Sequence, residues 1–174
     1  MIDMSKARGV AAAIAAIGAL GFASSASAAP LPEPTDPSIV VGESLGGVSV
    51  GQALTDAQAA WVVDADCKDQ AGSRACEYGS SRRGTATILA NEDVVASAMI
   101  QAPYRGGEYV FRGPLMDFRT TKGDLGLGDK LKAVAKRYPQ AKEAFRSLIV
   151  KSKGTRTVFF THKRRITQII LSLR

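Results

Sequence analysis

The stretch that decides the predicted fold is "LGLGDKLKAVAKRYP", residues 125–139. A similar cadence occurs earlier in "VSVGQALTDAQAAW", residues 48–61. Each stretch has a glycine, Gly51 or Gly128, followed by apolar residues at the spacing of one helical face, and each reaches an aromatic residue. The two stretches therefore predict a short amphipathic helix in each half of the chain.

The residues around these helices indicate where each should begin and end. Asp129 is expected to cap the start of the second helix, and Pro139 is expected to stop it. In the first helix, Thr55 and Gln58 have the spacing of a capping box that begins slightly later. Both helices are therefore expected to be short and capped by side chains.

Strand-like sequence follows each predicted helix. Residues 85–101 and 155–173 both alternate as hairpins, with "ANED" and "THKR" at their tips. One helix and one hairpin of this size would be only marginally stable alone. We therefore expect an α+β fold of two tandem helix-plus-antiparallel-sheet repeats in two layers. Chance similarity between two ordinary helix–strand alternations is the alternative.

The second stretch resembles the repeat of the beta-lactamase inhibitory protein family, the related SmpA/OmlA lipoproteins of outer-membrane assembly, and small secreted bacterial proteins of unknown function. The resemblance rests on short motifs at Thr121, Gly123, Leu125, Leu127, Gly128, Asp129 and the Tyr138-Pro139 ending. It implies a helical layer on an antiparallel sheet and carries no catalytic residue. Ala53 and Lys130 stand where family members often have threonine. The inhibitors' contact residues have no match, so inhibition is not implied.

Residues 1–28 have the layout of a secretory signal peptide. Lys6 and Arg8 precede an apolar run at residues 9–22, and small residues follow it. We expect cleavage near Ala28, which makes the mature chain secreted, either extracellular or in the cell envelope. A retained membrane anchor is the alternative, but the run is short for a span of about 20 residues. No later stretch is long and apolar enough to span a bilayer.

The mature chain is expected to consist of an arm followed by the two repeats. Prolines crowd the segment "PLPEPTDP", which predicts an extended, solvated arm. The expected divisions are an arm at 29–44, repeat 1 with a disulfide at 45–101, a connecting hairpin at 102–121 and a basic repeat 2 at 122–174.

Cys67 and Cys76 are the two cysteines of the chain. In an exported protein such a pair most simply forms one disulfide. A redox-active or nucleophilic thiol is the alternative, but CxxC spacing is absent. Two cysteines and one histidine do not make the pattern of a zinc site.

Charge divides the mature chain into two unlike halves. Residues 30–100 hold four Lys or Arg against ten Asp or Glu, whereas residues 101–174 hold seventeen against five. The positive C-terminal half predicts an anionic partner: an envelope polymer, a lipid surface or an acidic protein. Export disfavours nucleic acid in this role. Self-association, acidic half to basic half, is an alternative.

Basic residues near the C-terminus are predicted to form a partner-binding surface. Its expected members are Lys151, Lys153, Arg156, His162, Lys163, Arg164 and Arg165. Strand alternation places Lys151 and Lys153 on one face, and it places Arg156 on one face with Phe160. Glu92 and Asp93 form an acidic hairpin tip that is predicted as a second contact.

No arrangement in the sequence predicts catalysis. His162 has no evident nucleophile or orienting partner, so a solvated turn residue is the simpler interpretation. The segment "GDLGLGDK" lacks phosphate-loop spacing, and Asp64, Asp66 and Asp69 lack the spacing of a calcium loop. We therefore expect no enzyme activity and no cofactor or metal. The predicted function is a secreted, non-enzymatic binding module for an anionic cell-envelope or protein partner. The alternative is a proteinaceous inhibitor of a secreted or envelope enzyme, and a small hydrolase has the least support.

Overall fold

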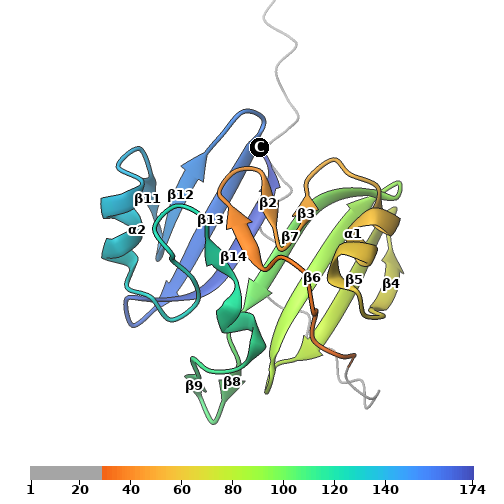
Figure 1. Cartoon of the computed structure of the whole chain (residues 1–174), viewed down its shortest axis with the longest axis horizontal. Coiled ribbons are helices and arrows are strands. Elements are labelled where there is room, and N and C mark those ends of the chain that lie inside the picture. The colour runs from red at the N-terminus through yellow and green to blue at the C-terminus, as the bar shows by residue number, and fades with distance from the viewer. Residues whose placement is uncertain (1–28) are drawn as a thin grey trace, which may run out of the picture.

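Strands are the predominant secondary structure of the protein in a computed structural model that describes residues 29–174 (Figure 1). Eight of them form one antiparallel sheet. Its order is β11 (Lys142–Ala144), β12 (Ser147–Lys151), β13 (Thr155–His162), β14 (Arg165–Leu173), β7 (Val94–Gln101), β6 (Gly84–Asn91), β5 (Ser73–Ser80) and β4 (Asp66–Gln70). The last strand, β14, therefore lies inside the sheet between β13 and β7.

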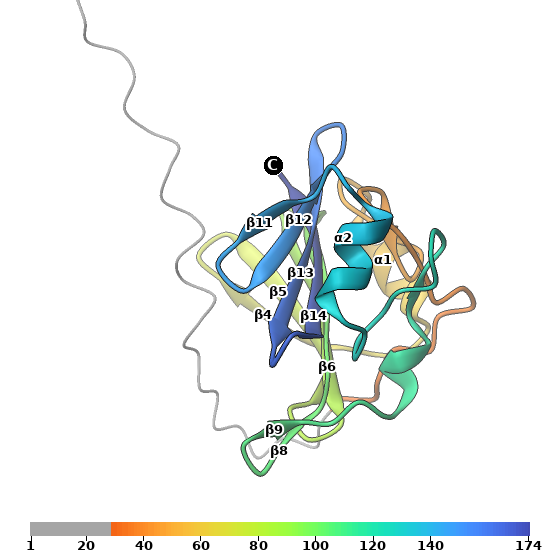
Figure 2. The same ribbon diagram turned by 90° about the vertical axis from the view of Figure 1, so that its left-hand side faces the viewer.

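Smaller elements cover one face of this sheet. Both helices lie on the same side of it, as the view in Figure 2 shows. These elements are a four-stranded sheet in the order β10 (Arg119–Thr120), β1 (Ser38–Val40), β2 (Ser44–Leu45) and β3 (Val48–Ser49); helices α1 (Leu54–Trp61) and α2 (Leu131–Arg137); and the 3₁₀-helix η1 (Pro114–Asp117). The hairpin of β8 (Tyr104–Arg105) and β9 (Glu108–Tyr109) projects beyond the end of the large sheet (Figure 1).

The predicted α+β fold of two tandem helix-plus-sheet repeats is wrong, because strands predominate over helices and the strands of the two expected repeats join in one continuous eight-stranded sheet. The helices are only eight and seven residues long. The central strands β7 and β14 pair directly, with Gln101 opposite Gln168 and Ser97 opposite Ser172. An unpaired strand edge exposes backbone donors and acceptors, so the two sets of strands join rather than standing as separate layers.

The similar cadence of the two stretches marks two tight turns onto the sheet. Gly51 and Gly128 have φ angles of 91° and 88°, values that favour glycine. Their N–H groups donate to the carbonyl oxygens of Val95 and Ile166, each at 2.8 Å. Each glycine therefore attaches the segment before its helix to the large sheet by a backbone hydrogen bond, at the beginning of β7 for Gly51 and of β14 for Gly128.

Neither helix uses the side-chain caps that the sequence predicts. The residues at the N-cap positions are Ala53 and Lys130, and no side chain caps either helix. The first helical N–H groups instead donate to hairpin carbonyls: Leu54 to Asp93 at 2.8 Å, and Leu131 to Arg164 at 3.1 Å. Because the sheet satisfies these donors, the Asp129 cap and the Thr55–Gln58 box are not needed.

Trp61, the last residue of α1, has its side chain in the hydrophobic core. It is fully buried, and its indole N–H donates to the carbonyl oxygen of Gly46 at 3.1 Å. Its ring meets that of Tyr78 on β5 edge to face, with ring centroids 5.0 Å apart. Helix α1 is therefore fixed to both the large sheet and the loop between β2 and β3.

The proline-rich segment at residues 30–37 has no helix or strand, but it is not solvated throughout. Pro32 is buried, and Leu31 packs against the core. The N–H of Glu33 donates to the carbonyl oxygen of Trp61 at 3.1 Å. The segment therefore runs along the protein surface in contact with α1, in contrast to the expected free arm. The expected signal peptide and its cleavage site near Ala28 lie outside the described residues.

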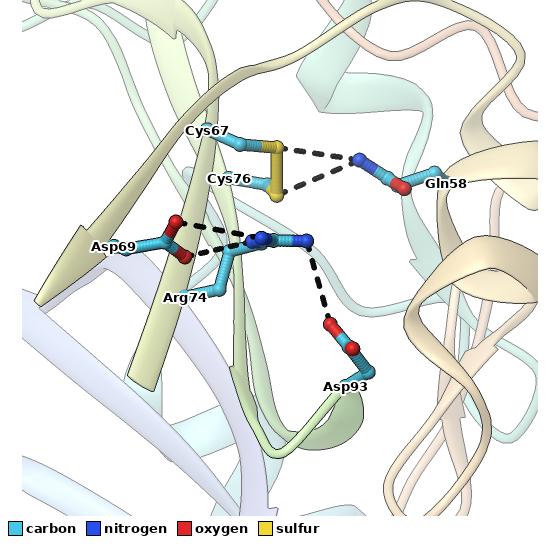
Figure 3. Close-up of polar contacts among 6 residues, drawn as sticks. All are labelled: Gln58, Cys67, Asp69, Arg74, Cys76 and Asp93. Carbon is cyan, nitrogen blue, oxygen red and sulfur yellow. Dashed lines mark hydrogen bonds and ion pairs between the residues drawn. A yellow bond between two sulfur atoms is a disulfide. The ribbon is translucent and has the colours of Figure 1, made fainter. Parts of the chain in front are cut away.

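The predicted disulfide between Cys67 and Cys76 is confirmed. The two residues are opposite each other on β4 and β5, and the side-chain amide of Gln58 on α1 lies 3.3 Å from the sulfur of Cys67 (Figure 3). A disulfide agrees with an exported chain. Within residues 29–174, no helix is both long enough and apolar enough to cross a bilayer.

Tyr78 provides a first testable prediction, because its buried hydroxyl has no hydrogen-bond partner among the described residues. Burial, with the carboxylate of Asp64, raises its pKa to about 12. Tyr78→Phe should therefore keep or raise the free energy of unfolding at pH 7, by up to about 1 kcal/mol. The folded state favours the neutral phenol, so wild-type stability should fall as pH rises from about 10 to 12. The Tyr78→Phe variant has no phenol at this position, so its stability should not show the part of this fall that comes from ionisation of Tyr78.

Urea titrations of both proteins between pH 7 and pH 12 would measure this difference. Tyr138→Phe is the matched control, because the hydroxyl of Tyr138 has a partner: it donates to the carbonyl oxygen of Lys122 at 3.0 Å. The control should be destabilised at pH 7 by about 1 kcal/mol. Equal destabilisation by the two substitutions would contradict an unsatisfied hydroxyl at Tyr78.

Candidate anion-binding site

Helix α2 and two hairpins meet at one end of the large sheet and enclose a pocket of about 580 Å³. The turn between β13 and β14 is formed by Lys163 and Arg164, both with positive φ angles, and its carbonyl at Arg164 accepts from the start of α2. The pocket is lined by Lys130, Leu131, Lys132, Ala135, Glu143, Leu148, Lys163, Arg164 and Arg165. Five of these residues are cationic and one is acidic.

Three of the lining cations have no partner among the described residues of the protein. Among residues 29–174, no hydrogen bond or ion pair involves the side chains of Lys130, Lys132 or Arg164, and all three are exposed. Their mutual repulsion is uncompensated by a neighbouring carboxylate within ion-pair distance. A bound anion would relieve that repulsion, because opposite charges across a half-enclosed surface attract more strongly than in bulk water.

The other two lining cations are held in place by protein groups. Lys163 forms an ion pair with Glu108 of β9 at 2.8 Å. That hydrogen bond lowers the pKa of Glu108 and raises the pKa of Lys163. Arg165 donates to the carbonyl oxygen of Gly128 at 2.8 Å, and its guanidinium lies over the ring of Phe111. Both charges are therefore fixed at the rim of the pocket.

The turn between β11 and β12 lies beside this site. Its two residues are Phe145 and Arg146, of which Arg146 has a φ of 53°. The carbonyl oxygen of Arg146 accepts the backbone N–H of Thr161 at 2.9 Å and the hydroxyl of Thr161 at 3.1 Å. Thr161 is near the end of β13, so the two turns lie next to each other.

Among residues 29–174, Phe145 is the most exposed of the large apolar side chains, with 86% of its surface accessible. The guanidinium of Arg146 lies 5.1 Å from the centre of its ring. Phe145 is absent from the residues that form or pack against the hydrophobic core. The ring therefore stabilises the fold little and is free to contact a partner.

The structure brings together some of the predicted site residues and separates others. His162, Lys163, Arg164 and Arg165 lie together at the pocket end of β13 and β14. Lys151 and Arg156 are opposite each other at the far end of β13, about 23 Å away for a strand of eight residues, and Lys153 lies in the adjoining loop. The seven residues therefore do not form one surface. The loop between β12 and β13 lies at one end of β13, and the turn between β13 and β14 lies at the other end.

His162 is exposed and packs against an aromatic residue. Its ring centre lies 5.7 Å from that of Tyr109 on β9, and Tyr109 in turn meets Tyr104 at 5.0 Å. Within the described part of the chain, no group of three or more His, Cys, Asp or Glu side chains could hold a metal ion.

The acidic tip forms the turn between β6 and β7, where Glu92 and Asp93 both have positive φ angles. Arg74 of β5 lies between Asp69 and Asp93, at 2.8 Å and 3.4 Å (Figure 3). Because β7 runs antiparallel to β14, this tip is at the opposite end of the sheet from the cationic pocket. One of its two acids is thus already paired within the protein.

Lys130, Lys132, Phe145 and Arg146 join the site although sequence reasoning missed them. They come from α2 and the β11–β12 turn, which meet the β13–β14 turn only in the folded sheet. For Phe145 and Arg146, the one signal in the sequence is the absence of acidic residues from Ala144 onward, a stretch that does not include Lys130 or Lys132.

Comparisons with known proteins give distant structural matches only. No family model matches the chain, and no curated protein matches it. One similar solved structure is an extracellular protein containing a SCP domain from Bacillus anthracis, at 10% identity and a TM-score of 0.47, with 71% of this chain and 43% of that chain covered. Another is a cysteine-rich secretory protein from Staphylococcus aureus, at 10% identity and a TM-score of 0.39, with 84% and 49% covered. The chain spans less than half the length of either protein.

The predicted resemblance to the beta-lactamase inhibitory protein family and the SmpA/OmlA lipoproteins is wrong. No model of such a family matches, and the strands join in one eight-stranded sheet with two short helices rather than in two repeats. The motifs that carried the resemblance are turn glycines, short apolar stripes and an aromatic end. Any chain that turns tightly onto a sheet before a short helix needs these residues, so they do not specify a family.

Proposed function

We propose that the protein is an exported, non-enzymatic binding module whose cationic pocket binds an anionic partner at the cell envelope or outside the cell. The observation that supports this function is the presence of three unpaired cations, Lys130, Lys132 and Arg164, around one pocket. The disulfide is consistent with the proposed location.

Electrostatics favours this use of the pocket over a merely soluble surface. Exposed lysines and arginines normally lie among carboxylates, which keeps like charges apart. Here Glu143 is the one acidic lining residue, and the apolar side chains of Leu131, Ala135 and Leu148 complete the wall. At physiological salt the Debye length is about 8–10 Å, so dissolved ions screen the attraction between the pocket and an anionic ligand. Binding should therefore weaken as the salt concentration rises.

Charge reversal tests this proposal. Lys132→Glu with Arg164→Glu should weaken the binding of long-chain polyphosphate at least about tenfold, because it replaces two cations by two acids at the pocket. Fluorescence anisotropy of labelled polyphosphate at 50, 150 and 300 mM NaCl would measure the affinity and its dependence on salt.

The matched control reverses two cations at the far end of β13. Lys151→Glu with Lys153→Glu changes the net charge by the same amount, and both side chains are exposed. We expect a loss of less than about threefold for this control at 150 mM NaCl, where distant charges are largely screened. Equal losses for the two double variants would show that net charge alone governs binding and would exclude a pocket site.

The alternative function, a proteinaceous inhibitor of a secreted or envelope enzyme that uses Glu92 and Asp93, has less support. Asp93 is already paired with Arg74, so only Glu92 presents an uncommitted acid at that turn. A stoichiometric complex with one enzyme that persists in high salt and depends on Glu92 would favour this alternative.

A further inference from the structure

We infer that the partner of the cationic pocket is the surface of a bilayer containing anionic lipids, with Phe145 entering the headgroup region and the neighbouring cations binding lipid phosphates. This inference rests on the proposed function and adds to it the kind of partner. It combines two independent features of the same end of the molecule: an unpaired cationic pocket and an aromatic ring that the fold leaves in water.

The exposure of Phe145 is the first step. A two-residue turn places its ring beyond the ends of β11 and β12, with 86% of its surface accessible. The residues beside it in sequence, Ala144 and Arg146, are exposed as well. An apolar ring held in water at the tip of a hairpin loses nothing on entering a membrane interface, where aromatic side chains are enriched.

The arrangement of charge around Phe145 is the second step. Lys142 and Arg146 of the same hairpin are exposed, and the Thr161–Arg146 hydrogen bonds hold the neighbouring β13–β14 turn alongside. Cations of the pocket and of the β11–β12 hairpin therefore lie at the same end of the sheet as the ring, and Glu143 is the one acidic residue of that hairpin. Each cation near an anionic bilayer raises the partition coefficient about fivefold.

The combination distinguishes a bilayer from a hydrophilic polyanion. Polyphosphate offers charge but no apolar phase, so the ring of Phe145 would gain little from binding it. A lipid surface offers phosphates to the cations and an acyl boundary to the ring. Basic residues that surround an exposed aromatic residue are typical of proteins that lie at a membrane surface. Phe145 is therefore the residue that separates the two kinds of partner.

Vesicle sedimentation tests the inference on the mature protein. Vesicles of phosphatidylcholine with 30% phosphatidylglycerol, about one anionic lipid in three, should bind the protein, and pure phosphatidylcholine vesicles should bind it at least about tenfold more weakly. Phe145→Ala should lower the partition coefficient on anionic vesicles about fivefold or more, and should leave the affinity for polyphosphate within about twofold.

Leu173→Ala is the matched control. Leu173 is an exposed apolar residue, and it lies at the end of β14 that is remote from the pocket. It should leave both the partition coefficient and polyphosphate binding unchanged. Circular dichroism melts of both variants would show that each is folded at the assay temperature.

The outcomes separate the inference from the proposed function. Polyphosphate binding without anionic vesicle binding would overturn the bilayer and leave the proposed function intact. Equal vesicle binding by Phe145→Ala and Leu173→Ala would also overturn the inference, because the ring would then have no part in it. Binding to neither polyphosphate nor vesicles would refute both.

Discussion

Replacing Trp61 with alanine should lower the free energy of unfolding by about 3–5 kcal/mol, the largest stability effect that we expect in this chain. The indole ring is fully buried between α1, β5 and the loop before β3. Truncation would remove its packing against Tyr78 and leave a cavity. It would also leave the carbonyl oxygen of Gly46 without the indole donor.

Urea unfolding followed by far-UV circular dichroism would measure this loss, with Trp61→Phe as the matched control. Phenylalanine fills most of the volume but cannot donate to Gly46, so its cost should be about 1–2 kcal/mol. Gly46 itself allows little adjustment, since a Cβ there would lie 2.4 Å from the ring of Phe118. A loss below about 1 kcal/mol for Trp61→Ala would contradict the central position assigned to the indole.

Removing the disulfide should have the second largest effect on stability. In the chain-entropy model, closing the ten-residue loop from Cys67 to Cys76 stabilises the folded state by about 2.5–3 kcal/mol. Cys67→Ala with Cys76→Ala should therefore lower the free energy of unfolding by about that amount. Strand β4 is at the edge of the sheet, so its amide hydrogens should exchange faster in the variant.

Reductant provides the internal control for this experiment. Dithiothreitol should destabilise the wild-type protein by an amount similar to the double substitution, and it should leave the double variant unchanged. Equal urea midpoints for the oxidised wild type and the double variant would show that the β4–β5 hairpin is stable without its crosslink.

Local features of the structure could be read from the sequence more reliably than its architecture. Gly51 and Gly128 are turn glycines, Cys67 pairs with Cys76, and Glu92-Asp93 and Lys163-Arg164 are hairpin turns. These features depend on backbone conformation or on short segments. The pairing of β7 with β14 depends on two strand edges far apart in the chain, and neither strand's sequence encodes its neighbour.

The same distinction applies to the candidate site. The run His162–Arg165 could be found because its charges are adjacent in sequence. Lys130 and Lys132 reach it only because the backbone of α2 bonds to the β13–β14 turn, and Phe145 reaches it only through the contact between Arg146 and Thr161. Strand alternation predicts that Lys151 and Lys153 belong to the same surface, although the length of β13 separates them from the His162–Arg165 run.

The position of β14 has a consequence for the way the protein folds. The strand nearest the C-terminus lies between β13 and β7, so the two parts of the large sheet cannot join until residues up to Leu173 are available. Ladders between distant segments form slowly, because a long loop must close first. A chain that emerges gradually from an export channel would therefore expose the edge of β7 until β14 has emerged as well. During this interval, aggregation through that edge competes with folding.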